Sequence, residues 1–217
     1  MVLKELGFKA GRIHESIVST YDESKTATAA PMGISTDDLE RIVVRPYLET
    51  TTYRNLSSRR CAVINLTHDP EIFYRTAFKD AKKGDRLPED WFEGAITVDA
   101  PRLRAAYAVL EVSVEEVRAE GDRATALCRV RLAEERPLIH GPYCRSTFAT
   151  IESIIHATRV KMFLEKEEMR KAEPLIGKIN QYRDLVKRVD PNSTCDGIME
   201  ALILKIDDWR KGVGQRT

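Results

Sequence analysis

The chain has 217 residues, of which 42% are hydrophobic and 32% charged, a composition typical of one large folded domain or one domain with a sizeable appendage. Thirty-five Lys and Arg residues balance 34 Asp and Glu residues, which gives a net charge of +1 at pH 7. This balance disfavours a dedicated nucleic-acid binder and a polybasic membrane-surface protein, because both classes carry a marked excess of basic residues.

The cysteines and histidines show no metal-binding pattern. The four cysteines lie far apart without a CxxC pair, and the four histidines lack HxxH or HExxH spacing, so we expect reduced thiols and no bound metal. Residues 1–11 lack the apolar stretch of a signal peptide, and no run reaches the ~20 apolar residues that a membrane span needs. These features predict a cytoplasmic protein whose partners are neither membrane nor nucleic acid.

The first part of the chain shows short strands separated by turns. Runs rich in β-branched residues predict strands at 12–20, 26–35, 39–45 and 60–66. Thr50–Leu56 predicts a short capped helix between the last two strands. Asp69 followed by Pro70 predicts a second helix that reaches about Lys79, and the polar residues 82–90 indicate an exposed loop.

Residues 105–133 form the clearest predicted hairpin. Both arms alternate apolar and polar residues around the turn Glu120-Gly121-Asp122. One face of the hairpin is expected to carry small and branched side chains, namely Ala106, Ala108, Leu110, Val112, Val114, Ala124, Ala126, Cys128, Val130 and Leu132. The sum is about seven antiparallel strands, which predicts a barrel or a sandwich.

From Tyr143 onward the apolar residues recur with a helical period. The pattern predicts one helix to about Lys171, a second that starts after Pro174 and ends near Val189, and a third capped by Ser193 or Thr194. The change of period divides the chain into a barrel domain, 1–140, and a helical domain, 141–217.

The segment between residues 45 and 52 has the residue types of a phosphate site. A strand ends at Arg45, and three consecutive threonines, Thr50, Thr51 and Thr52, begin the next helix. Unpaired N–H groups at a helix N-terminus, hydroxyl donors and a nearby guanidinium all favour an anion. The alternative is that Thr50 or Thr51 only caps the helix and that Arg45 pairs with Glu49.

Amides and small residues near the same segment favour a heterocyclic ligand. Asn55 lies in the helix of the threonines, and Asn65 ends the next strand beside Thr67, so mixed donors and acceptors are expected at one cavity mouth. The small residues of Ala29–Gly33 would let a planar ring approach the backbone. The alternative for that segment is a bulge or a tight crossing at a barrel corner.

Several stretches resemble a family of functionally unassigned archaeal and bacterial flavoproteins with an FMN-binding split-barrel fold. The resemblance covers most of the chain and combines pieces that are each weak alone. They are 15–20, 29–33, 45–47, 51–56, 63–69, Arg145, and 151–159. The fold class that it implies is mainly β plus α, an antiparallel split β-barrel followed by a three-helix segment.

The resemblance also implies a cofactor and its contacts. It implies a homodimer with one FMN per subunit near the dimer interface, and its motifs point to a set of binding residues in this chain. Arg45, Thr51 and Thr52 would hold the phosphate. The residues along the ribityl chain and the ring would be Met32, Gly33, Asn55 and Asn65, with Thr67 beside Asn65. Tyr53 would cover the ring or pack beneath it. Where the family has Phe-Asn-Arg, this chain has Tyr143-Cys144-Arg145, which keeps only the arginine. Arg145 and Arg159 are expected as cofactor or substrate contacts.

Three functions are compatible with these features. The first is an FMN-dependent oxidoreductase that takes a hydride from NADH or NADPH and passes it to a small acceptor; no catalytic side chain is singled out, since the cofactor supplies the hydride chemistry. The second is a flavin carrier or sensor without turnover. The third is a single-strand-binding barrel of OB type, which the balanced charge of the first 136 residues disfavours.

Overall fold

The computed structural model describes residues 2–79, 86–136 and 144–214, which belong to two compact units. The barrel unit comprises Met1–Thr67 and Lys79–Ile139, and the helical unit comprises His68–Phe78 and His140–Thr217. The predicted loop at 82–90 lies partly outside the described residues, and its end overlaps a 3-10 turn at Glu89–Trp91.

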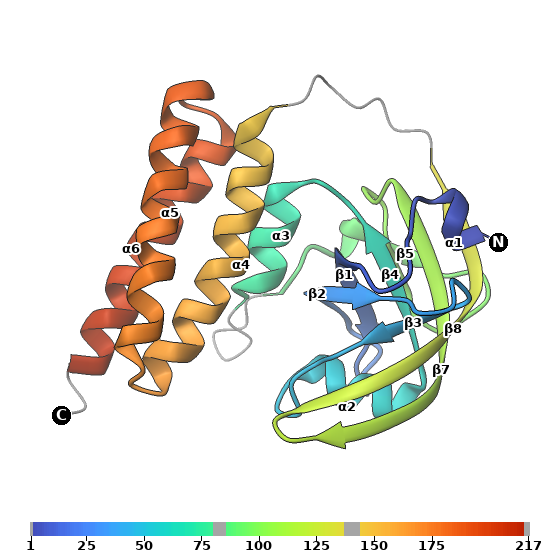
Figure 1. The fold of residues 1–217 in the computed structure, drawn as a ribbon. Helices are drawn as coiled ribbons and strands as arrows, with labels where there is room; N and C mark the ends of the chain where they lie inside the picture. The colour runs from blue at the N-terminus through green and yellow to red at the C-terminus, as the bar shows by residue number, and fades with distance from the viewer. Residues whose placement is uncertain (1, 80–85, 137–143, 215–217) are drawn as a thin grey trace. The chain divides into compact units, whose positions relative to one another are not determined.

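Six antiparallel strands close the barrel in the order β1-β2-β3-β8-β7-β4 (Figure 1). The strands are β1 (Ile13–Tyr21), β2 (Ala27–Ser35), β3 (Arg41–Val44), β4 (Cys61–Leu66), β7 (Ala108–Glu120) and β8 (Arg123–Glu135). Two further strands, β5 (Phe92–Gly94) and β6 (Pro101–Leu103), pair into a small ribbon. The predicted fold class is confirmed, and the sequence pattern that allowed a barrel or a sandwich forms a barrel.

The long hairpin of β7 and β8 turns where the sequence predicts it. Gly121 has a φ of +62° at the first position of the two-residue turn, a conformation that glycine adopts without steric cost. The register shifts at two points along the hairpin. Because one shift leaves Arg131 without a cross-strand partner, Ala133 packs against the core and not Leu132, which corrects the predicted face of the second arm.

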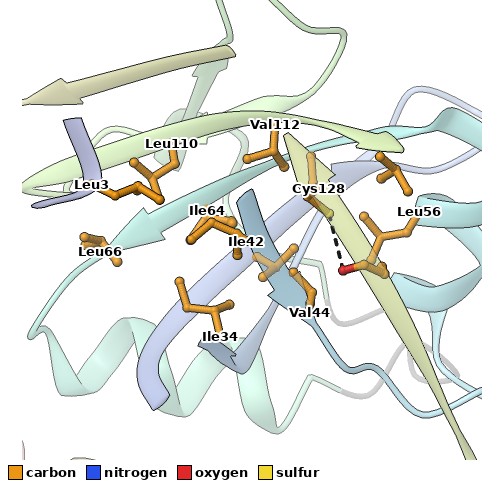
Figure 2. Close-up of a cluster of buried hydrophobic side chains, with 14 of the residues drawn as sticks. Leu3, Ile34, Ile42, Val44, Leu56, Ile64, Leu66, Leu110, Val112 and Cys128 are labelled. Carbon is orange, nitrogen blue, oxygen red and sulfur yellow. Dashed lines mark hydrogen bonds between the residues drawn. The ribbon is translucent and has the colours of Figure 1, made fainter. Parts of the chain in front are cut away.

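The barrel encloses an apolar core to which every strand of the barrel contributes. Figure 2 shows Ile42 of β3, Ile64 of β4 and Cys128 of β8 within this one cluster. Leu56 of the helix α2 (Thr51–Arg59) is fully buried in the same cluster. Since α2 packs against β1, β4 and β7, the core fixes the helix that carries the threonine cluster.

Strand β2 keeps an edge that no described strand covers. It pairs with β1 along its whole length but with β3 only at Ile34 and Ser35. No described strand covers the other edge of β2 over 27–33, which explains how Pro31, a residue without an N–H donor, is accommodated in the strand.

The helical unit consists of α3 (Pro70–Ala77), α4 (Arg145–Glu165), α5 (Met169–Val189) and α6 (Thr194–Gly214). The last three lie side by side in Figure 1, and α3 packs against α4 and α6. The predicted caps are confirmed, because Asp69 accepts hydrogen bonds at the start of α3 and the Ser193 hydroxyl accepts one from the Asp196 N–H. Among the described helices, none has an apolar stretch that would carry it through a bilayer.

The break between the first two long helices lies earlier than predicted. Helix α4 ends at Glu165, and Pro174 lies inside α5 and does not start it. Glu167 has a φ of +58°, while the N–H groups of Glu167 and Glu168 bond to the carbonyls of Leu164 and Phe163. This is the Schellman arrangement, whose usual glycine is absent here, so the sequence carries no visible stop signal.

Candidate functional site

The connection from β3 to α2 is held against the turn of the long hairpin. After Val44 the chain passes through Arg45 and Pro46, and the Leu48 N–H donates to the Asp122 carbonyl at 3.1 Å. The Arg123 guanidinium lies over the Tyr47 ring, 4.0 Å from its centroid. These contacts fix the loop that presents Arg45 and leads into the threonine cluster.

The three threonines divide between capping and exposure. Thr50 is the N-cap of α2, because its Oγ1 accepts the Tyr53 N–H at 3.2 Å and donates to the Tyr47 carbonyl at 2.7 Å. Thr51 is exposed, while Thr52 is buried and its hydroxyl makes no hydrogen bond with the described residues. The backbone N–H groups of Thr51 and Thr52 likewise have no acceptor in that part of the chain.

Arg45 does not form the ion pair that the alternative interpretation required. Its side chain is exposed and makes no hydrogen bond or ion pair with Glu49 or any other described residue. A second arginine, Arg54, was not predicted as a site residue. Its guanidinium donates to Thr51 Oγ1 at 3.0 Å and to the Glu49 carbonyl at 3.4 Å, which the i,i+3 spacing from Thr51 could have indicated.

The N-terminus of α2 therefore has more donors than acceptors. It offers two backbone N–H groups, the Thr52 hydroxyl and the remaining guanidinium N–H groups of Arg45 and Arg54. Hydrogen bonds between such donors and an ionised oxygen are about twice as strong as neutral ones. The donor set fits a phosphate monoester, and we call it the phosphate corner.

The two asparagines differ in what their amides can still bind. Asn55 donates from Nδ2 to Thr20 Oγ1 at 2.8 Å, and its Oδ1 has no partner among the described residues. Asn65 is fully buried: its Nδ2 donates to Ser19 Oγ at 2.8 Å and the Ile17 carbonyl at 2.9 Å, and its Oδ1 accepts the Leu103 N–H at 2.8 Å. Asn55 thus has an acceptor left for a ligand, whereas the Asn65 amide joins β1, β4 and β6.

The predicted ring segment lies on β2 next to the open edge. The Met32 carbonyl accepts the Ser16 hydroxyl at 3.0 Å. A Cβ on Gly33 would lie 3.1 Å from Ile13 Cγ2, so a larger residue here would require the Ile13 side chain to shift by a few tenths of an ångström. The β1–β2 register runs through this segment without a bulge, so the bulge alternative does not apply to the pairing with β1. Contact of Met32 and Gly33 with a ligand stays a prediction.

The remaining predicted site residues are not gathered by the described contacts. Tyr53 is half-buried on α2, and Thr67 is buried directly after β4. Arg145 and Arg159 are exposed residues of α4 in the helical unit, 14 positions apart, or about 21 Å along the helix axis. Tyr143 lies outside the described residues.

One basic residue near β2 was missed by the sequence analysis. Lys79 is partly buried, and its Nζ donates to Thr28 Oγ1 at 2.6 Å and to the Ala29 carbonyl. Burial lowers the pKa of its ammonium to about 8. In the sequence Lys79 stands at the start of a charged stretch that resembles solvated loop, so nothing in the pattern marked it.

A closed six-stranded antiparallel barrel with a donor-lined corner and C-terminal helices defines the class of FMN-binding split barrels. A family model described as the N-terminal domain of a protein of unknown function, DUF447, matches residues 14–136. The chain therefore belongs to this family.

Two solved structures show how far the likeness extends. An FMN-bound protein of the DUF447 family from Methanosarcina mazei, MM1853, is 25% identical, covers 94% of this chain and 99% of its own, and superposes with a TM-score of 0.75. The flavin reductase HpaC complexed with NADP+ is 16% identical, covers 64% of this chain and 88% of its own, and has a TM-score of 0.50. The second likeness is one of fold alone.

Proposed function

We propose that this protein binds FMN in its barrel unit and acts as an oxidoreductase that passes electrons from NADH or NADPH to a small acceptor. The observation that supports this proposal most directly is the phosphate corner, where Arg45 and the first turn of α2 offer donors that have no acceptors among the described residues. The FMN found in the related protein from Methanosarcina mazei supports the choice of ligand.

The residues of the chain then take separate roles. Arg45, Thr51, Thr52 and Arg54 bind the phosphate, and the Asn55 Oδ1 accepts a hydrogen bond from the ribityl hydroxyls. The open edge of β2 over 27–33 receives the planar ring. When bound, FMN supplies hydride transfer, and the protein contributes binding, orientation and charge around the ring.

Replacing Arg45 by Ala should weaken FMN binding about 10- to 100-fold and leave riboflavin binding nearly unchanged. A hydrogen bond to a charged group is worth about 1.5–3 kcal/mol, and riboflavin lacks the phosphate that would receive it. The measurement is quenching of flavin fluorescence on titration with apo-protein. Arg131→Ala, which removes an exposed arginine from β8, serves as the matched control. Equal loss for both flavins would contradict a phosphate role for Arg45.

The oxidoreductase part of the proposal has its own test. Oxidised flavins generally absorb at ~450 nm. Protein loaded with FMN should lose this absorbance when NADH or NADPH is added without oxygen. Retention of the absorbance would leave a flavin carrier or sensor. A protein that takes up no added FMN would overturn the whole proposal.

We include a homodimer in this proposal. The barrel unit exposes two large apolar side chains, Ile13 at 72% and Ile96 at 71%, and β2 has an open edge that needs cover. Sedimentation equilibrium should give a mass of twice the 24.7 kDa chain. A species at the chain mass across the concentration range would contradict the dimer.

A further inference from the structure

Lys79 is a cation of the barrel unit that has no anionic partner among the described residues. Its Nζ donates to Thr28 Oγ1 and to the Ala29 carbonyl, and no carboxylate of the described residues lies within ion-pair distance of it. An ammonium has three N–H donors, so one remains unused. A partly buried cation without a carboxylate partner lowers the stability of the fold. Such groups are often found where the charge interacts with a ligand.

A line of contacts connects Lys79 to the phosphate corner. Thr28, which accepts from Lys79, is the cross-strand partner of Thr20, so the two side chains share one face of the β1–β2 pair. Thr20 in turn accepts from Asn55, which lies one turn after Thr51 and Thr52 on α2. The phosphate corner and the Lys79 ammonium therefore lie at the two ends of one line of neighbouring residues, joined by two hydrogen bonds and one cross-strand pair.

The contact of Lys79 with β2 fixes what its ammonium can face. Ala29, whose carbonyl it binds, begins the segment Ala29–Gly33 beside the open edge of β2. A ligand whose phosphate sits at the α2 N-terminus and whose ribityl chain passes Asn55 brings its ring toward this segment. The unused N–H of Lys79 then has a ring acceptor as its natural partner.

We propose, on the basis of the proposed function above, that Lys79 binds the C2 carbonyl oxygen of the flavin ring and stabilises its reduced state. Two-electron reduction with uptake of one proton at N5 leaves one negative charge spread over N1 and the C2 oxygen. Lys79 stays protonated throughout and serves as the counter-charge. It is a cofactor contact that tunes the potential and transfers no proton.

The test uses Lys79→Met, Lys79→Arg and, as a matched control, Lys9→Met, which replaces an exposed lysine of the barrel unit. Lys79→Met should weaken FMN and riboflavin binding to a similar extent, about tenfold, because the lost contact is to the ring. Reduced FMN should lose about tenfold more affinity than oxidised FMN, which lowers the two-electron midpoint potential by about 30 mV. Lys79→Arg should restore most of both quantities, and Lys9→Met should change neither.

Each outcome either supports the proposed role of Lys79 or overturns it. Loss of affinity for FMN alone would make Lys79 a phosphate ligand and overturn the assignment, as would unchanged affinity and potential. Wild-type protein that binds neither flavin would overturn the proposed function and this assignment with it. Thermal unfolding of the apo-proteins separates these results from misfolding, because Lys79→Met removes a costly buried charge and should unfold no lower than wild type.

Discussion

Replacing Glu111 by Gln should lower the free energy of unfolding by about 3–5 kcal/mol, the range measured when one member of a buried ion pair is removed. Glu111 is fully buried on β7 and pairs with Arg102 of β6, which is only 3% exposed. Its carboxylate also accepts the N–H groups of Ile96 and Thr97, at 2.7 and 2.5 Å. A Gln side chain would bring an NH₂ group against these donors and would take the buried carboxylate away from Arg102. Among the described residues the guanidinium would then keep only Glu134, at 2.9 Å and 37% exposed, as an ionic partner.

The matched control for Glu111→Gln is Glu116→Gln. Glu116 lies on the same strand and pairs with Arg118, but both side chains of that pair are about half exposed or more. Exposed ion pairs contribute about 0–1 kcal/mol, so this variant should unfold close to wild type in urea. Equal stability of the two variants would contradict the structural role of Glu111.

The stabilisation by Glu111 should also depend on pH. Burial alone raises the pKa of Glu111, but hydrogen bonds from Thr97, Ile96 and Arg102 outweigh it and leave the pKa below its usual 4.5. The unfolded chain therefore takes up the proton first as the pH falls. The difference in free energy of unfolding between wild type and Glu111→Gln should have its full value above pH 4.5 and become smaller below it.

Elements with a clear period were predictable from the sequence, whereas features that depend on distant partners were not. The alternation in β7 and β8 and the Asp69-Pro70 start of α3 are local signals, and both are confirmed. The end of α4 was missed because a glutamate, Glu167, takes the left-handed position where glycine is usual. Local pattern thus gave the barrel and its helices but not every boundary.

The candidate site divides in the same way. The residues of the phosphate corner are close in sequence, so their spacing could indicate them together. Lys79 reaches Thr28 across 51 positions, and the hydrogen bond from the Leu103 N–H to Asn65 Oδ1 spans 38. Neither contact leaves a trace in composition or periodicity, because closure of the barrel alone brings these groups together. Closure of the barrel also decides whether an asparagine amide is used up by hydrogen bonds within the barrel, as in Asn65, or keeps an acceptor for a ligand, as in Asn55.

Asn65→Leu should lower the free energy of unfolding by about 3 kcal/mol, since a buried polar group left without its partner costs about 1–3 kcal/mol. The Leu103 N–H, the Ile17 carbonyl and Ser19 Oγ all lose an amide partner. Asn55→Leu removes the same amide group, but one with a single hydrogen bond, to Thr20, so it should cost about 1 kcal/mol.

The two asparagine variants should show the opposite order in FMN affinity. The Asn55 Oδ1 has no partner in the described part of the chain, so Asn55→Leu should weaken FMN binding about tenfold. Asn65→Leu protein that folds should bind FMN nearly as tightly as wild type does. Urea unfolding and fluorescence titration of both variants measure the two orders. If Asn65→Leu lost affinity while keeping its stability, the amide of Asn65 would have to turn from the barrel toward the ligand. Its hydrogen bonds within the barrel would then not be what holds it.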